Sequence, residues 1–272
     1  MRSALRALIT RPEEDAAPLA AALGRRGIDC LIEPMLRIVP VAAPSLDLTG
    51  VQALVITSAN GARAFAAASP RRDLPVYAVG DASAAAARGL GFARVESAAG
   101  DVAALAAVGR RRADPAAGPL MPPVGRVSAG DLAGRLGALG FTLRRSVLYE
   151  AKPAQGFSAT LEAALRRLVA GDGDAPAAGL RWVMFFSPRS AAVFVGLARA
   201  AGLMAAGRRL KALCLSRNVA EAAAAIDWRT IAVAVRPEQE ALLALIDRDL
   251  DVAQKRRSRA AGGERSAGHR DA

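Results

Sequence analysis

Short apolar runs alternate with alanine-rich segments along most of the 272 residues, and this alternation restricts the chain to few folds. Residues 51–57 and 182–186 have the length and the Val, Ile and Phe content of buried strands, and each run precedes a segment of helical composition. Such alternation predicts an α/β fold whose parallel sheets carry helices on both faces. Alanine makes up about a quarter of the chain and aromatic residues only 4%, which favours closely packed helices over an all-β fold.

The same pattern assigns the individual elements. Strands are expected over residues 4–9, 51–57, 75–79, 94–96, 143–150, 182–186, 211–215 and 231–235, with a weaker candidate at 120–124. That candidate is weaker because Pro122 and Pro123 remove hydrogen-bond donors from a ladder. Helices are expected over residues 17–25, 61–68, 83–89, 102–108, 131–139, 159–169, 190–200, 219–225 and 238–249.

The order of elements occurs twice. VQALVITSANGARAFAAA and LRWVMFFSPRSAAVFVGLA share an apolar strand, a terminal Ser and an alanine-rich helix, and LPVYAVGDASAAAARGLGF and LKALCLSRNVAEAAAAI form a second such pair. The spacing between the paired segments is far longer than a solenoid repeat, so two similar α/β domains are expected.

Two extended segments, PMLRIVP and SVLYEAKP, suggest where these domains join. They predict a first, discontinuous domain of residues 1–35 and 152–250 and an inserted domain of residues 41–146. Residues 36–40 and 147–151 are then expected to be antiparallel linker strands.

The net charge of +12 has two sources. Residues 252–272 hold six Lys and Arg against two acidic residues, which leaves +8 for the rest of the chain. This basic tail is poor in large apolar residues and is expected to be disordered. The remaining excess of positive charge suits an anionic ligand.

The scarcity of reactive side chains excludes several classes of chemistry. His269, in the tail, is the one histidine, and Cys30 and Cys214 lie in separate apolar segments. An ordinary zinc site, a Ser-His-Asp triad and a Cys-His dyad are therefore not expected, and neither is a disulfide framework. No run reaches the ~18 apolar residues that span a bilayer, and Arg6 interrupts the short N-terminal apolar stretch. A cytoplasmic protein with no membrane partner is expected.

Polar residues or glycine follow the predicted strands, at the end where open α/β sheets bind ligands. They are Thr10, Arg11, Ser58, Asn60, Gly80, Ser83, Ser187, Ser216 and Asn218. Ser and Asn are also favoured helix caps, so a purely structural explanation remains open. A proline inside a helix costs about 3 kcal/mol, so Pro18 predicts a loop over residues 11–16 and a first helix that starts near Pro18. Tyr149 lies in the second linker segment, and a phenol is a proton donor at neutral pH.

Taken in order, these segments resemble the uroporphyrinogen-III synthase family. The resembling segments are LITRP, EPMLRIVP, LVITSANGARAF, VYAVGDASA, AGDLAGRLGALGF, SVLYEA, VMFFSPRSAAVF and the helix after VAVRP. The resemblance implies two flavodoxin-like domains, each a parallel sheet with helices on both faces, joined by a two-stranded linker with a cleft between them. It also implies a cyclising lyase of tetrapyrrole and heme biosynthesis. This enzyme closes the small-molecule substrate hydroxymethylbilane with inversion of the last pyrrole ring and loss of water.

The resemblance also implies roles for single residues. Tyr149 matches the tyrosine thought to assist departure of the hydroxyl. Five of the strand-end positions fall at the ligand-facing turns of the family, namely Thr10, Arg11, Ser58, Ser83 and Ser187. No metal or organic cofactor is implied. A monomer is expected, and the substrate would be available for transfer from the preceding pathway enzyme. One turn departs from the family pattern, because Val219 stands where a Thr is common, so Ser216 or Asn218 would have to replace its contact.

Two other classes of protein remain open. The same frame would suit a non-catalytic protein that binds an acidic small molecule and leaves the isomer ratio of bilane closure unchanged. A nucleic-acid-binding protein would use the basic tail, although no aromatic residues accompany its charges. Deleting residues 252–272 would abolish the function of such a protein and spare the enzyme.

Overall fold

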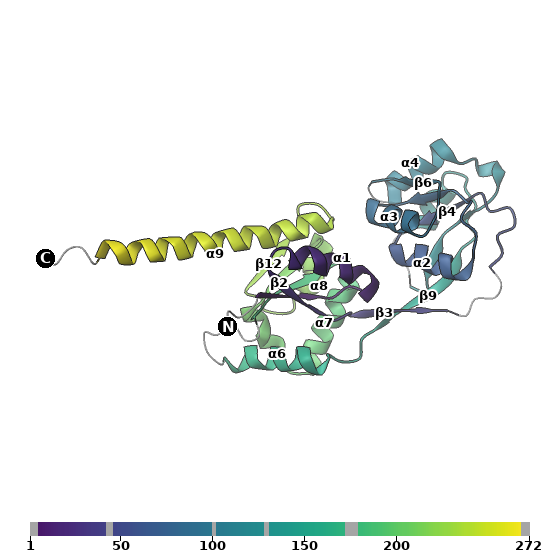
Figure 1. The fold of residues 1–272 in the computed structure, drawn as a ribbon. Coiled ribbons are helices and arrows are strands. Elements are labelled where there is room, and N and C mark those ends of the chain that lie inside the picture. Colours follow the sequence, from purple (N-terminus) through teal and green to yellow (C-terminus); the bar gives the residue numbers. More distant parts are fainter. Residues whose placement is uncertain (1–4, 42–45, 100–101, 128–130, 172–178, 268–272) are drawn as a thin grey trace. The chain divides into compact units, whose positions relative to one another are not determined.

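The computed structural model describes residues 5–41, 46–99, 102–127, 131–171 and 179–267. The chain forms two compact units (Figure 1). Unit 1 consists of Met1–Arg37 and Pro153–Ala272, and unit 2 of Ile38–Lys152. Unit 1 is therefore built from both ends of the chain.

The sheet of unit 1 has five parallel strands in the order β12-β11-β10-β1-β2. Their bounds are Leu5–Ile9 (β1), Ile28–Ile32 (β2), Leu180–Phe185 (β10), Lys211–Cys214 (β11) and Thr230–Val233 (β12). This is the flavodoxin-like order, in which the direction of winding reverses between the first and third strands. Here the reversal lies between β1 and β10.

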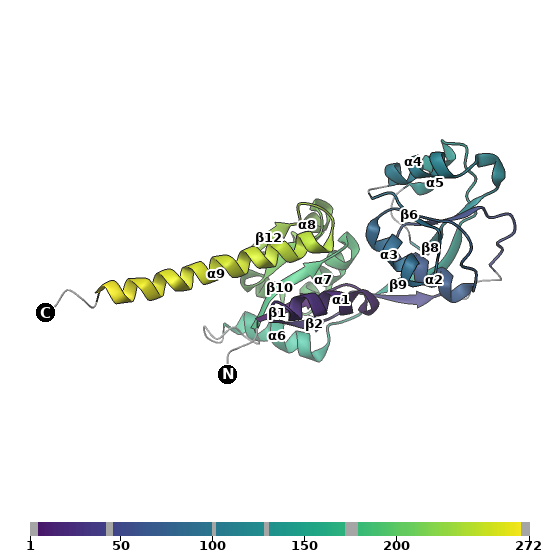
Figure 2. The same ribbon diagram turned by 45° about the horizontal axis from the view of Figure 1, so that its top comes forward.

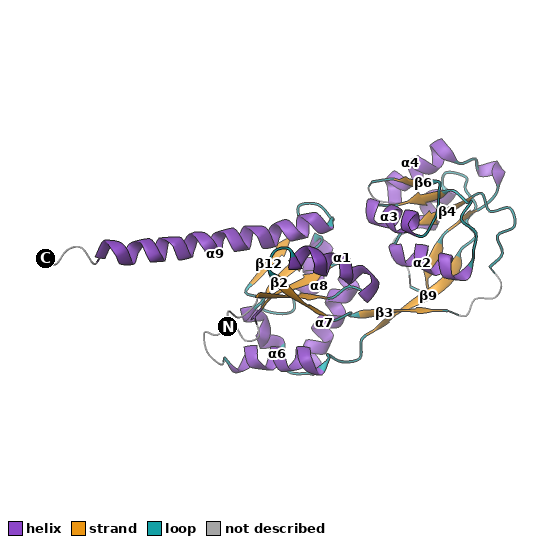
Figure 3. Ribbon diagram, viewed as in Figure 1, coloured by secondary structure: helices purple, strands orange, loops and turns teal. Residues whose placement is uncertain are grey.

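Helices cover both faces of this sheet (Figure 3). They are α1 (Glu13–Gly24), α6 (Ala159–Ala170), α7 (Pro188–Ala200), the short η3 (Met204–Arg209), α8 (Arg217–Ala223) and α9 (Gln239–Ala267). Side chains alternate along β10, so Val183 and Phe185 pack with α6, α7 and α8, whereas Trp182 and Met184 pack with α1 and α9. A continuous apolar strand is therefore buried on both sides, as a parallel sheet requires.

Unit 2 contains a smaller parallel sheet in the order β6-β5-β4-β7. Its strands are β4 (Ala53–Ile56), β5 (Val76–Ala78), β6 (Val95–Ser97) and β7 (Leu120–Met121). The helices are α2 (Ala59–Ala68), α3 (Asp81–Gly89), α4 (Val102–Arg112), the short η1 (Pro115–Ala117) and α5 (Leu132–Gly137). Leu54 and Ile56 pack into one cluster and Ala53 and Val55 into another, so two apolar layers again enclose the sheet.

A third sheet, in the order β3-β9-β8, contains the strands that connect the units. They are β3 (Leu36–Pro40), β8 (Pro123–Gly125) and β9 (Ser146–Pro153). The Val41 amide donates to the Leu148 carbonyl at 3.0 Å, and the Ala154 amide donates to the Met35 carbonyl at 3.0 Å. Residue numbers fall along one strand as they rise along the other, so β3 and β9 run antiparallel. The predicted α/β fold with parallel sheets is confirmed, and residues 36–40 and 147–151 lie in β3 and β9.

The expected start of the first helix is wrong. Helix α1 begins at Glu13, directly after Pro12, and contains Pro18 in its interior. Glu13 and its two acidic neighbours stabilise the positive end of the helix dipole. Burial of Ala16 and Leu19 against the sheet offsets the hydrogen bond that Pro18 cannot make.

The expected disorder of the tail is also contradicted as far as Ala267. Helix α9 continues to that residue and extends beyond the sheet of its own unit (Figure 2). Alanine, arginine and lysine have high helix propensity, and no proline follows Pro237, so the local sequence allows the helix to continue. His269 lies outside the described residues. Among the described residues, no helix has the length and hydropathy needed to cross a membrane.

Strand β2 was not predicted from the sequence. Asp29 interrupts its apolar run, and the strand is only partly buried at the edge of the sheet. Its pairing with β1 over residues 28–32 is a tertiary interaction that the local pattern does not indicate.

One carboxylate attaches α9 to the sheet. Asp249 accepts hydrogen bonds from Trp182 Nε1 at 2.9 Å and from Lys211 Nζ at 2.6 Å. We expect Asp249→Ala to lower the free energy of unfolding by about 1–2 kcal/mol, because two donors lose their acceptor. Chemical denaturation followed by Trp fluorescence measures this change. Asp251→Ala, an exposed position on the same helix, is the control, and an equal loss in both variants would contradict the role of Asp249.

Candidate active site

The predicted residues of unit 1 lie at the carboxyl edge of its sheet. Thr10 and Arg11 follow β1, Ser187 follows β10 by two residues, and Ser216 follows β11 by two residues. Because the strands are parallel and β1 neighbours β10, these residues meet at one edge around the reversal of strand order. The structure therefore brings together residues that are far apart in the sequence.

Thr10 links the end of β1 to β10 at this edge. Its side chain is fully buried, and Oγ1 donates to the Met184 carbonyl of β10 at 2.7 Å. The Thr10 carbonyl accepts from the Met35 amide at 3.1 Å. The hydroxyl proton is thus used within unit 1, and its role in substrate binding stays a prediction.

Arg11 contacts side chains from other elements of unit 1. Nη1 donates to Gln239 Oε1 at 3.2 Å, and Nη2 lies 3.6 Å from Asp15 Oδ2. The guanidinium carbon lies 4.6 Å from the centre of the Phe186 ring. Only 21% of the Arg11 side chain is exposed. A cation is therefore fixed at the edge where an anionic ligand is expected.

The two serine turns of unit 1 differ in how their hydroxyls are used. Ser187 caps α7, because its Oγ accepts from the Ser190 amide at 3.1 Å and donates to Ser190 Oγ at 2.9 Å. Ser216 occupies the N-cap of α8 without a capping hydrogen bond from its side chain. Asn218 is exposed in the first turn of α8. Ser216 and Asn218 therefore keep polar groups at this edge.

The start of α8 departs from the resembled family pattern at Val219, where a Thr is common. Only 1% of it is exposed, and it packs in the hydrophobic core beneath α7 and α8. The side chain at this position is part of the core of unit 1. Val219 therefore contributes an apolar contact to this core.

The predicted residues of unit 2 also lie where strands end and helices begin. Ser58 follows β4 and caps α2, with Oγ accepting from the Gly61 amide at 3.2 Å. Asn60 Oδ1 accepts from Arg63 Nη2 at 2.6 Å. Gly80 is the N-cap of α3, and Ser83 is nearly buried in its first turn. The amino ends of α2 and α3 therefore lie at the carboxyl edge of this sheet.

Tyr149 lies against this edge. Its hydroxyl is 3.3 Å from Ser58 Oγ, although the two residues are 91 positions apart. Gly125 makes the position of the ring possible, because a Cβ there would lie 2.9 Å from Tyr149 Cε2. The Arg126 amide donates to the Tyr149 carbonyl at 2.9 Å and fixes the backbone. The structure thus pairs the predicted catalytic phenol with a predicted substrate-binding serine.

Sequence reasoning missed several residues that shape these edges. Those that contact the predicted residues directly are Asp15, Arg63, Gly125, Phe186, Ser190 and Gln239. Arg63 was detectable, since it lies three residues after Asn60 on one helix face. Gln239 was not, because its contact with Arg11 joins residues 228 positions apart.

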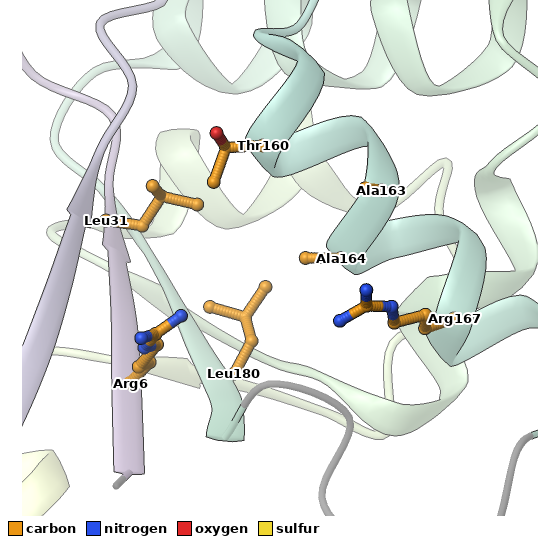
Figure 4. A pocket seen from close by; sticks show the side chains of 7 residues that line it. All are labelled: Arg6, Leu31, Thr160, Ala163, Ala164, Arg167 and Leu180. Atoms are coloured by element: carbon orange, nitrogen blue, oxygen red, sulfur yellow. The ribbon is translucent and has the colours of Figure 1, made fainter.

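One cavity of unit 1 lies apart from the predicted residues (Figure 4). It measures about 180 Å³ and is lined by Arg6, Leu31, Thr160, Ala163, Ala164, Arg167 and Leu180. None of the predicted site residues line this cavity.

The comparisons with known proteins identify the family. A family model described as uroporphyrinogen-III synthase HemD matches residues 17–244. The chain belongs to the uroporphyrinogen-III synthase family. The predicted activity, a cyclising lyase of tetrapyrrole biosynthesis, is thereby confirmed at the level of the family. No curated protein gives a significant match.

Solved structures were found that cover most of this chain. The uroporphyrinogen-III synthetase of Helicobacter pylori 26695 is 15% identical over 89% of this chain and 98% of that chain, with a TM-score of 0.56. A mutant uroporphyrinogen III synthase of the extremely thermophilic bacterium Thermus thermophilus is 17% identical over 91% of this chain and 99% of that chain, with a TM-score of 0.49. The first of these supports the α/β architecture described above.

The two cysteines of this synthase lie in apolar surroundings. Burial raises the pKa of the Cys214 thiol to about 12. Burial, together with the neighbouring charge of Asp29, raises the pKa of the Cys30 thiol to about 11. Both groups are therefore thiols at neutral pH, and the thiolate is the form that reacts as a nucleophile.

We expect the native protein to resist alkylation by iodoacetamide at pH 8. The thiolate fraction of Cys30 is then on the order of one in a thousand, and Cys214 is also fully buried. Alkylation of Cys30 should rise with pH toward 11, whereas Cys214 should react only after unfolding. Mass spectrometry of timed samples, with unfolded protein as the control, measures both rates. Alkylation of native Cys214 as fast as in the unfolded chain would contradict the expectation.

Proposed function

We propose that this member of the family converts hydroxymethylbilane into uroporphyrinogen III without a cofactor. The terminal hydroxyl leaves as water, and the substituted carbon of the last pyrrole ring bonds to the methylene carbon that carried it, which gives a spiro intermediate. The older bond between that ring carbon and the chain then breaks and re-forms at the free α-carbon of the same ring, which inverts the ring and releases the proton of that α-carbon. The observation that carries the assignment of roles is the pairing of Tyr149 with Ser58 at the carboxyl edge of unit 2. We also propose that the two units act as separate domains.

Tyr149 is the proposed proton donor to the departing hydroxyl. Ser58 Oγ already accepts from the Gly61 amide, so its own O–H can donate to the Tyr149 oxygen 3.3 Å away. In that arrangement the phenol hydrogen points away from Ser58 and is available to the substrate. A hydroxide is a poor leaving group, and a donor that protonates it as the C–O bond breaks lowers the barrier.

The proposed binding of substrate uses the strand-end groups of each unit. The bilane carries eight carboxylates, as the family resemblance implies. Arg11 is the cation of unit 1 proposed to bind one of them. The amino ends of α2, α3 and α7 offer backbone N–H groups, with Ser58, Asn60, Gly80, Ser83 and Ser187 at or near them. Thr10, Ser216 and Asn218 complete the proposed substrate-binding set.

Positioning accounts for the selectivity of the proposed reaction. The linear bilane can close without an enzyme to the uninverted isomer, so the protein must favour attack by the substituted carbon. A difference of ~4 kcal/mol between the two routes gives nearly a thousandfold preference. Holding a flexible substrate in one conformation can supply this difference without strong acids or bases.

We further propose that the enzyme acts as a cytoplasmic monomer that receives its substrate from the preceding pathway enzyme. Light scattering after size-exclusion chromatography tests the monomer directly. A dimer mass at working concentration would contradict it.

The proposed reaction is tested by the isomers that form from supplied hydroxymethylbilane. We expect the type III isomer to predominate when the porphyrinogens are oxidised and separated by chromatography. Boiled protein is the control and should give the type I isomer. Type I alone, at the uncatalysed rate, would contradict the synthase and favour the non-catalytic binding protein.

The role of Tyr149 is tested by Tyr149→Phe, which removes the hydroxyl and keeps the ring. We expect kcat to fall about 10–100-fold, a modest effect at or below the lower end of the range for general-acid contributions. Ser58→Ala should give a smaller fall, because the phenol loses its partner and keeps its proton. Tyr77→Phe is the matched control, since the Tyr77 hydroxyl donates to the Arg112 carbonyl at 2.9 Å and is not part of the proposed site. An unchanged rate and isomer ratio in Tyr149→Phe would remove Tyr149 from the mechanism.

A further inference from the structure

The guanidinium of Arg11, at the carboxyl edge of the sheet of unit 1, contacts both neutral and negatively charged side chains. We propose that Gln239 and Phe186 are positioning residues that orient Arg11 toward substrate carboxylates, and that Asp15 is a built-in competitor that weakens its hold on them. This inference rests on the proposed function, because it assigns Arg11 a carboxylate ligand. It concerns residues that the sequence did not single out.

Geometry supports the positioning role. The guanidinium is planar, and its orientation is set once its face and two of its nitrogens are fixed. The Phe186 ring lies 4.6 Å from the guanidinium carbon and fixes the face. Gln239 Oε1, at 3.2 Å from Nη1, and Asp15 Oδ2, at 3.6 Å from Nη2, fix the in-plane rotation.

Burial makes these contacts effective. The side chains of Arg11 and Asp15 are 21% and 16% exposed. Charges in such surroundings are screened less than in water, so each contact has a larger effect on the conformation of Arg11. The exposed fraction still leaves the side chain within reach of a ligand from solvent.

The different charges of Gln239, Phe186 and Asp15 give these residues different effects on Arg11. The Gln239 amide and the Phe186 ring are neutral, so they orient Arg11 without cancelling its charge. Asp15 is an anion, and it interacts with the same guanidinium that a substrate carboxylate would bind. Loss of Gln239 should therefore weaken substrate binding, whereas loss of the Asp15 charge should strengthen it.

The contact between Gln239 and Arg11 connects helix α9 to the proposed substrate-binding edge. Gln239 is its first residue, and Leu242, Leu243 and Ile246 bury the following turns against the sheet. The packing of this helix therefore determines where the amide of Gln239 lies. A helix from the C-terminal end of the chain thus orients a residue that directly follows the first strand.

The test compares, in the full-length protein, a variant that should raise KM with a variant that should lower it. Gln239→Met keeps the length of the side chain and removes the acceptor. We expect it to raise KM for hydroxymethylbilane about 3–10-fold with kcat changed less than about twofold. Asp15→Asn keeps an acceptor oxygen and removes the charge, and should lower KM about 2–5-fold. Glu14→Gln is the matched control, since it removes one charge from the same turn of α1 at an exposed position.

Binding of uroporphyrin, an octacarboxylate, provides a readout that does not need turnover. Titration followed by porphyrin fluorescence should show Kd shifting in the same directions as KM. In an Arg11→Met background the Gln239→Met change should have no further effect on Kd, because Gln239 acts through Arg11. A merely structural contribution of Gln239 would persist in that background.

Three outcomes would overturn the inference. They are an unchanged KM and Kd in Gln239→Met, an effect of Gln239→Met that persists without Arg11, and equal shifts in Asp15→Asn and Glu14→Gln. Failure of the proposed function gives a different result, namely type I isomer alone from the wild-type protein. The uroporphyrin titration still decides the positioning roles in that case.

Discussion

The parallel pairing of β1 with β10 is the constraint on which the structure of unit 1 depends. It joins residues 6–9 to residues 180–184, with all of unit 2 between them in the sequence. The buried Thr10 hydroxyl extends this pairing by one more contact, to the Met184 carbonyl. Because β1 and β10 lie side by side at the reversal of strand order, their carboxyl ends bring Arg11 and Ser187 to a common edge.

The carboxyl edges of the two sheets are built alike but are chemically different. In each unit, serine, threonine or glycine follows several of the strands, and helices begin there with backbone N–H groups at the edge. The described edge of unit 2 adds a phenol that is paired with a serine, and that of unit 1 adds an oriented cation. A repeated architecture therefore provides similar backbone hydrogen-bond donors, and single side chains give each edge its own chemistry.

Hydroxyl groups at these edges are used in three ways, which the sequence could not separate. The Thr10 hydroxyl bonds within the sheet, the Ser187 hydroxyl caps a helix, and the Ser58 hydroxyl both caps a helix and contacts Tyr149. All three residues follow apolar strands, so their local sequence signals are the same. Only the neighbouring strands and helices determine whether a hydroxyl is already satisfied.

The sequence by itself determined the class of fold, the positions of most strands and helices, and which residues follow the strands, because hydrophobic periodicity and helix caps are local properties. It did not determine β2, the start of α1 at Glu13 or the extent of α9, where packing or helix propensity outweighed an unfavourable local signal. The pairs Ser58–Tyr149 and Arg11–Gln239 came from the tertiary structure alone. Their members lie 91 and 228 residues apart, and such contacts depend on strand order and helix packing that no local pattern encodes.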